Sequence, residues 1–141
     1  MIRLADVRDI DALAQLEQIC NPSAWSAAQL QAALVLPNHI WVIEAENHLA
    51  AMLVWQHMGD EAEIHLINTH PQHRRCGLAR QLLNHLFQAA ADMKINRVLL
   101  EVRRSNSAAQ TLYHQLGFTV CGQRRAYYAN GEDAVIMERI C

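Results

Sequence analysis

The feature of this chain that most constrains its fold is a change of hydrophobic pattern near its middle. Three apolar runs of strand length come first, separated by short polar turns: Ile40–Ala45, Leu49–His57 and Ala62–Thr69. Their spacing predicts an antiparallel meander. Leu78–Lys94 then repeats leucine at helical spacing, and Arg97–Val102 returns to a strand pattern. A strand, a helix and a strand in this order predict a crossover, so we expect a mixed α/β sheet covered by helices.

The other segments extend this sheet and its helices. Ser26 and Gln29 have the form of a capping box, which predicts that a helix begins there and that Pro37 stops it. Asn130-Gly131 is typical of a hairpin turn, with a loop of three to five residues. The other elements that we expect are a strand at Ile2–Ala5, a helix from Asp6 or Asp9 to Cys20, a helix from Ser26 to Leu36, a helix from Ser105 or Asn106 to Leu116, and strands at Phe118–Tyr128 and Ala134–Ile140.

Composition narrows the class of protein. The 141 residues suit one domain, residues 1–141, and 52% apolar content is too high for a disordered chain. No apolar run approaches the ~18 residues of a membrane helix, and the first residues lack the apolar segment of a secretory signal. The net charge of -2 gives no bulk attraction to nucleic acid. The four cysteines form no CxxC pair, which argues against a disulfide framework or a thiolate zinc site and favours the cytoplasm.

A polar loop, His70–Gly77, precedes the leucine-rich helix and has the chemistry of an anion site. Unpaired amides at a helix start favour phosphate, and Gly77 allows the phosphate to approach the backbone closely. Arg74, Arg75 and Arg80 add charge, and arginine suits forked contacts with phosphate. The loop lacks the Gly-Lys-Ser/Thr of a Walker loop and the three glycines of a dinucleotide fingerprint. On its own it also fits a basic loop with a glycine turn.

Two side chains after this helix are candidates for a functional role. Glu101 interrupts an apolar strand, and a carboxylate there needs a partner or a role as a base. Tyr113 lies on the short helix that follows. The alternatives are an outward-facing glutamate and a core tyrosine with a hydrogen-bonded hydroxyl.

Histidines and acidic turns offer weaker signals. His65, His70 and His73 lie near Cys76, but no HExxH or paired-cysteine spacing accompanies them, so we expect no metal site. The acidic pieces at 59–63 and 131–133 read as solvated turns, or as surfaces that attract a cationic peptide.

Together these segments resemble a known family. The loop Arg-Arg-Cys-Gly-Leu-Ala is similar to the acyl-CoA loop of the GCN5-related N-acetyltransferase (GNAT) superfamily. LLEVRRSNSAAQTLYHQLGF, the tail RRAYYANGEDAVIMERI and Ala24-Trp25-Ser26 resemble one branch, the bacterial ribosomal-protein-alanine N-acetyltransferases. The resemblance implies a mainly antiparallel sheet of about seven strands flanked by about four helices. Asn68, Thr69 and His70 depart from the apolar-apolar-Asp run common in the family, and Ala79 stands where glycine is usual.

The resemblance also implies a reaction. Acetyl-CoA is the expected acetyl donor, with Glu101 as general base and Tyr113 as general acid. The expected acceptor is a protein N-terminus, above all the N-terminal alanine of small-subunit ribosomal protein number eighteen. A small-molecule amine is the alternative acceptor, and an acyl-CoA-sensing module is a non-enzymatic alternative. Cys76 raises a covalent route, disfavoured by its place in the phosphate loop and its lack of a base. The residues implied to bind acetyl-CoA are Ile67, Asn68, Thr69, Arg74, Arg75, Cys76, Gly77, Leu78, Ala79, Arg80, Asn106 and Tyr113.

Overall fold

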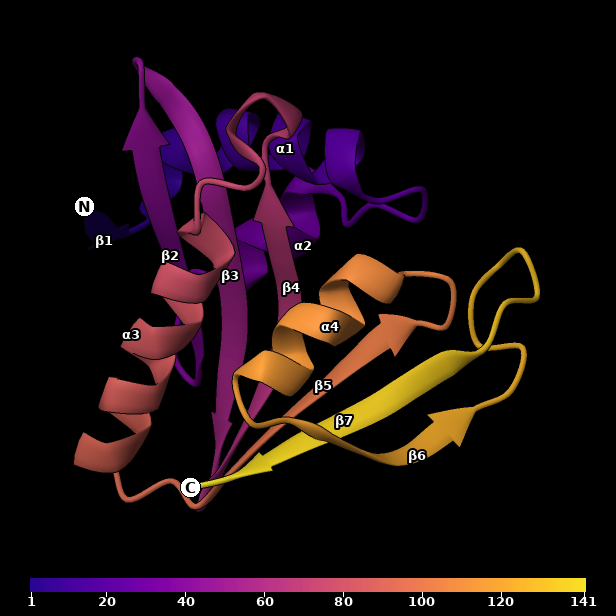
Figure 1. The fold of residues 1–141 in the computed structure, drawn as a ribbon. Helices are drawn as coiled ribbons and strands as arrows, with labels where there is room; N and C mark the ends of the chain where they lie inside the picture. Colours follow the sequence, from indigo (N-terminus) through magenta and orange to yellow (C-terminus); the bar gives the residue numbers. More distant parts are fainter.

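A single seven-stranded sheet organises the protein, which we describe over residues 1–141 from a computed structural model. The strands lie in the order β1-β2-β3-β4-β5-β7-β6 (Figure 1). Neighbours are antiparallel except for β4 and β5, which are parallel because α3 joins them as a crossover. The strands are β1 (Ile2–Leu4), β2 (Asn38–Ala45), β3 (His48–Met58), β4 (Glu61–Thr69), β5 (Arg97–Arg103), β6 (Thr119–Arg124) and β7 (Ala134–Ile140).

Helices cover both faces of this sheet. The α3 and α4 helices lie on the face nearer the viewer in Figure 1, and α1 and α2 lie behind it. Each face therefore has its own core: one contains Leu83 and Tyr113, and the other contains Leu13 and Leu30. The helices are α1 (Ile10–Cys20), α2 (Ala27–Ala32), α3 (Leu78–Asp92) and α4 (Ser107–Gln115), with 3-10 turns η1 (Val7–Asp9) and η2 (Pro71–His73). No helix has the length and apolar character needed to cross a membrane.

An irregularity in β4 opens the middle of the sheet. Trp55 of β3 pairs with Ile64, but its neighbour Val54 pairs with Leu66, so His65 is an extra residue in a bulge. The bulge also moves the buried side chains from the α3 core at Ile64 to the α1 core at Leu66. The parallel ladder with β5 spans only 61–64 and 97–100, and beyond it the two strands diverge (Figure 1).

Most of the predicted elements are confirmed. The three-stranded meander forms, and its first turn places Glu46 and Asn47 at φ of 54° and 65°, as a tight hairpin requires. Ser26 and Gln29 form the predicted capping box. The mixed α/β fold with seven strands and four α-helices is likewise confirmed.

Two predicted boundaries are wrong. The second helix ends at Ala32 rather than Leu36, with Ala33 as its C-cap. Leu36 itself precedes Pro37, and that position is disfavoured in the helical region. The predicted strand Phe118–Tyr128 ends at Arg124, and residues 125–133 form a loop longer than three to five residues. Side chains hold this loop: Glu132 accepts a hydrogen bond from the Ser105 amide at 2.7 Å, and Asp133 accepts one from the Ala126 amide at 2.9 Å.

Candidate active site

The start of α3 forms a cradle of backbone amides. Gly77 caps the helix in a left-handed conformation, with φ 76° and ψ 16°, and no side chain caps the helix. The amides of the first turn therefore lack the intrahelical and side-chain acceptors that other helix positions have. A Cβ added to Gly77 would meet no heavy atom within 4 Å, so the space above the loop is open. This arrangement fits a phosphate, which the helix dipole also favours.

A cavity of about 350 Å³ lies at this helix start. It contains most of the loop residues that the sequence implied for the acyl donor. Arg80 lines it, and its guanidinium donates a hydrogen bond to Gln115 of α4 at 2.7 Å. The lining residues are Thr69, His73, Arg74, Arg75, Gly77, Leu78, Ala79, Arg80 and Leu112.

A second cavity, of about 550 Å³, occupies the opening between the diverging ends of β4 and β5. Ile67 and Asn68 line it from β4, Glu101 lines it from β5, and Asn106 and Tyr113 come from the start and the body of α4. The structure therefore brings both predicted acid–base residues to one cleft. The crossover explains this, because β5 and α4 are consecutive and α4 packs over the sheet beside the opening.

Glu101 faces this cleft with a cation beside it. Its side chain is 21% exposed, and the Arg124 Nε donates to its Oε1 at 2.9 Å. Arg124 is the last residue of β6, so it reaches across the intervening β7. The ion pair supplies the partner that a carboxylate on an otherwise apolar strand requires.

Tyr113 is nearly buried, at 5% exposure, and its ring packs 5.8 Å from that of Phe118. Burial raises the pKa of the Tyr113 hydroxyl above its ordinary value, and the nearby Tyr128 adds to this shift. Because the hydroxyl keeps its proton at neutral pH, Tyr113 is suited to donate a proton or a hydrogen bond in the cleft.

The comparison with known proteins gives the family. Residues 10–118 match the profile described as the acetyltransferase (GNAT) family. The chain belongs to this family. It is 36% identical, over 96% of its length and 94% of the relative, to the "[Ribosomal protein bS18]-alanine N-acetyltransferase" of Salmonella typhimurium. The crystal structure of the ribosomal-protein-S18-alanine N-acetyltransferase from Escherichia coli matches with a TM-score of 0.92 and 32% identity, covering 99% of this chain and 92% of that one.

Membership confirms the predicted class of enzyme. This GNAT acetyltransferase uses acetyl-CoA as its acetyl donor. The structure fits such a donor at the α3 start, where open amides and arginine side chains suit the anionic pyrophosphate. A more distant structure, Ard1 from Thermoplasma volcanium, has a TM-score of 0.88 at 22% identity and supports the fold.

Not every implied residue of the GNAT site lines a cavity. Cys76 is exposed and lines neither the α3 cavity nor the cleft, and its thiol lies 3.7 Å from the Arg74 carbonyl oxygen. Asn68 does line the cleft, but its amide nitrogen donates to Glu17 at 2.9 Å. The side chain of Asn106 caps α4 by accepting from the Ala109 amide at 3.1 Å.

Three cleft residues were not singled out from the sequence. Tyr127 and Tyr128 supply aromatic side chains to the walls, as Trp25 does, and Arg124 holds Glu101. Glu17 is fully buried, and its position within the apolar stripe of α1 was the one available signal.

The acidic side chains at the end of the last loop pair with two arginines at the end of β5. Glu132 lies 3.4 Å from the guanidinium of Arg103, and Asp133 lies 3.6 Å from that of Arg104. Hydrogen bonds from the side chain of Ser105, from its backbone amide and from the Arg103 guanidinium lower the pKa of Glu132. These carboxylates therefore fix the loop at the cleft.

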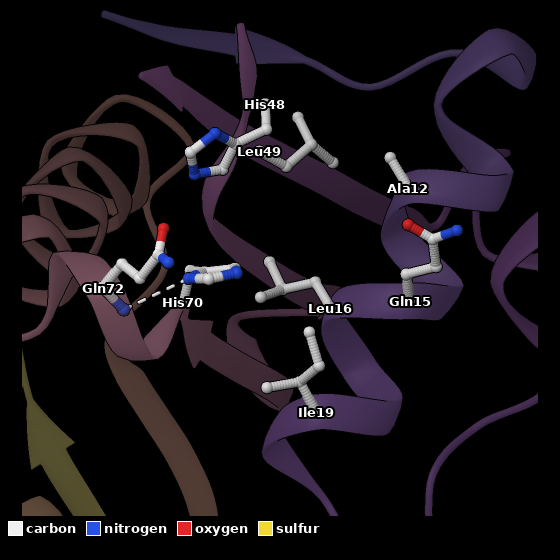
Figure 2. A pocket seen from close by; sticks show the side chains of 8 residues that line it. All are labelled: Ala12, Gln15, Leu16, Ile19, His48, Leu49, His70 and Gln72. Carbon is white, nitrogen blue, oxygen red and sulfur yellow. Dashed lines mark hydrogen bonds between the residues drawn. The ribbon is translucent and has the colours of Figure 1, made fainter. Parts of the chain in front are cut away.

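A third cavity lies apart from the cleft, between α1, the start of β3 and η2. Figure 2 shows the imidazoles of His48 and His70 on one side of it and Leu16 and Ile19 of α1 on the other. His73, outside this cavity, brings its Nε2 to 2.9 Å from the His48 Nε2. His70 Nδ1 accepts a hydrogen bond from the Gln72 amide at 3.1 Å (Figure 2). No set of three or more His, Cys, Asp or Glu side chains is arranged to hold a metal ion.

Proposed function

We propose that residues 1–141 act as one N-acetyltransferase domain that acetylates the N-terminal α-amine of a protein. The first candidate acceptor is the N-terminal alanine of ribosomal protein bS18. The observation that carries the proposal is the similarity, at 36% identity over 96% of the chain, to a protein named for that reaction. We further propose that the enzyme acts in the cytoplasm, where its four free cysteines meet a reducing environment.

The donor would occupy both cavities. Amides and guanidinium groups of residues 74–80 would hold the phosphates, and the strand end Ile67–Thr69 would lie against the acyl-bearing arm. The position of Asn106 and Tyr113 in the cleft supports a role for both near the reacting end. We propose that Cys76 contacts the phosphates of the donor through its backbone, since its exposed thiol lies outside both cavities.

The proton transfers are divided between two residues. Glu101 takes a proton from the α-ammonium, directly or through water, and so frees the nitrogen lone pair to attack the thioester carbon. As the carbon–sulfur bond breaks, Tyr113 gives its proton to the departing thiolate or stabilises it by a hydrogen bond. The exposed position of Cys76 favours this direct transfer over a covalent route.

Proton cost favours an α-amine over lysine as acceptor. A protein α-amine has a pKa of about 7.7–8.0, against about 10.4 for lysine, a difference worth roughly 3.5 kcal/mol at neutral pH. A single carboxylate base suits the more acidic ammonium. In the cleft, Glu63 and Glu101 supply negative charge toward a cationic chain end.

Mass spectrometry of a peptide panel tests the proposal. An Ala-initiated, Arg-rich peptide incubated with the protein and acetyl-CoA should gain one acetyl group at its α-amine. The matched peptide with a blocked N-terminus and an internal lysine should stay unmodified. Equal labelling of the blocked peptide at lysine would overturn the α-amine assignment, and transfer only to small amines would support the alternative acceptor class.

A further inference from the structure

A buried carboxylate behind the cleft wall has no part in the proton transfers. Glu17 lies on α1 and is fully buried, and none of the ion pairs of the structure includes it. A carboxylate without water or a cation destabilises a fold unless hydrogen bonds satisfy it. Its contacts therefore indicate why this position holds glutamate.

Hydrogen-bond donors reach Glu17 from two different segments. Its Oε1 accepts from the Asn68 Nδ2 at 2.9 Å. Its Oε2 accepts from the Trp25 amide at 2.7 Å and, at 3.5 Å, from the Asn21 Nδ2. Both oxygens thus act as acceptors, which is the pattern of a carboxylate. Bonds of this charge-assisted kind are stronger than those between neutral groups.

The two segments that Glu17 joins are both walls of the cleft. Asn68 belongs to the end of β4, and Trp25 and Asn21 belong to the loop between α1 and α2. The indole of Trp25 lies 5.8 Å from the imidazole of His65, the bulge residue. The residues next to Asn21 and Asn68 are joined by a further hydrogen bond, which the Cys20 thiol donates to the Thr69 carbonyl oxygen at 3.4 Å.

We propose that Glu17 is a positioning residue for the acceptor chain. By accepting from Trp25 and Asn68 together, it holds the α1–α2 loop against the end of β4, so that the two present one continuous wall to the incoming peptide. The inference rests on the proposed function, because the acceptor it positions is the protein chain end. The backbone amides and arginines of residues 74–80, which would hold the phosphates of the donor, make no hydrogen bond to Glu17.

The test is Glu17→Gln, which keeps the side-chain volume but presents an amide N–H₂ to one of the present donors. The KM for the acceptor peptide should rise about tenfold, since a lost hydrogen bond to a charged group typically changes an equilibrium by that much or more. The kcat at saturating peptide and the Kd for acetyl-CoA should both change less than the KM, because residues 74–80, which would hold the phosphates, make no hydrogen bond to Glu17. Glu46→Gln, at an exposed turn, is the matched control and should alter none of the three.

Asn68→Ala gives a second measurement, because it removes one donor to Glu17 and also serves if Glu17→Gln does not fold. It should raise the acceptor KM, and the double variant should have a KM no higher than Glu17→Gln alone, since both remove the same tie. A folded Glu17→Gln enzyme with an unchanged acceptor KM, or an equal loss of acetyl-CoA affinity, would overturn the inference alone. An unmodified enzyme that acetylates no peptide would overturn the proposed function, and this inference with it.

Discussion

Two glycines allow a test of the proposal that the backbone amides at the start of α3 bind the phosphates of acetyl-CoA. Gly77 at the start of α3 and Gly59 in the β3–β4 turn have φ of 76° and 62°, and a Cβ added at either would meet no heavy atom within 4 Å. Alanine at either position therefore causes the same backbone strain and no clash. They differ in place, because Gly77 lines the α3 cavity and Gly59 does not.

The expected stability loss follows from the conformation. A residue with a side chain costs roughly 1–2 kcal/mol in the left-handed region, so Gly77→Ala and Gly59→Ala should lose about the same free energy of unfolding. For acetyl-CoA, the new methyl group at Gly77 holds the phosphates away from the amides. Losing one hydrogen bond to a charged group costs about 1.5–3 kcal/mol, which corresponds to a rise in Kd of about 10- to 100-fold.

Urea unfolding measures the first quantity and isothermal titration calorimetry with acetyl-CoA measures the second, each on protein whose circular dichroism matches the parent. The Gly59→Ala variant should bind acetyl-CoA as the parent does. Equal Kd values for the two variants would show that the donor does not approach the backbone at Gly77, and the placement of its phosphates would be wrong.

Two further predictions concern protonation. Glu101→Gln and Tyr113→Phe should each lower turnover by about 10²–10⁴-fold. The Glu101 variant should recover in part at high pH, where the amine deprotonates unaided. Full turnover in both variants, under conditions limited by chemistry, would refute the assigned roles. His39 lies flat on Trp55, with ring centroids 4.2 Å apart, and burial, helped by His57, lowers the pKa of its imidazole. The unfolded chain therefore binds a proton at His39 more readily than the folded one as the pH falls below about 6.5. The contribution of His39 to the free energy of unfolding should be present above that pH and lost below it. His39→Gln should make this dependence shallower in urea unfolding at pH 7.5 and 5, and an unchanged dependence would contradict the cause given.

The sequence by itself determined the local helices and strands and the anion-binding chemistry of the loop before α3. Apolar runs of strand length between short polar turns place the meander. Leucines at helical spacing place α3, because that spacing reports which face of a helix is buried. Gly77 before that helix predicted a close backbone approach, and it adopts the left-handed conformation that glycine tolerates best. The resemblance of whole segments singled out Glu101 and Tyr113, which the fold brings to one cleft.

Only the tertiary structure decided how these elements combine into a site. The bulge at His65 and the divergence of β4 from β5 depend on strand register, which two strands set together and neither encodes alone. Arg124 reaches Glu101 across β7, because the sheet order places β7 between β5 and β6. Glu17 is buried because donors 8 and 51 residues away in the chain satisfy its oxygens. Contacts between residues so far apart in the chain form only after the layers pack, which is why the composition and spacing of single segments do not reveal them.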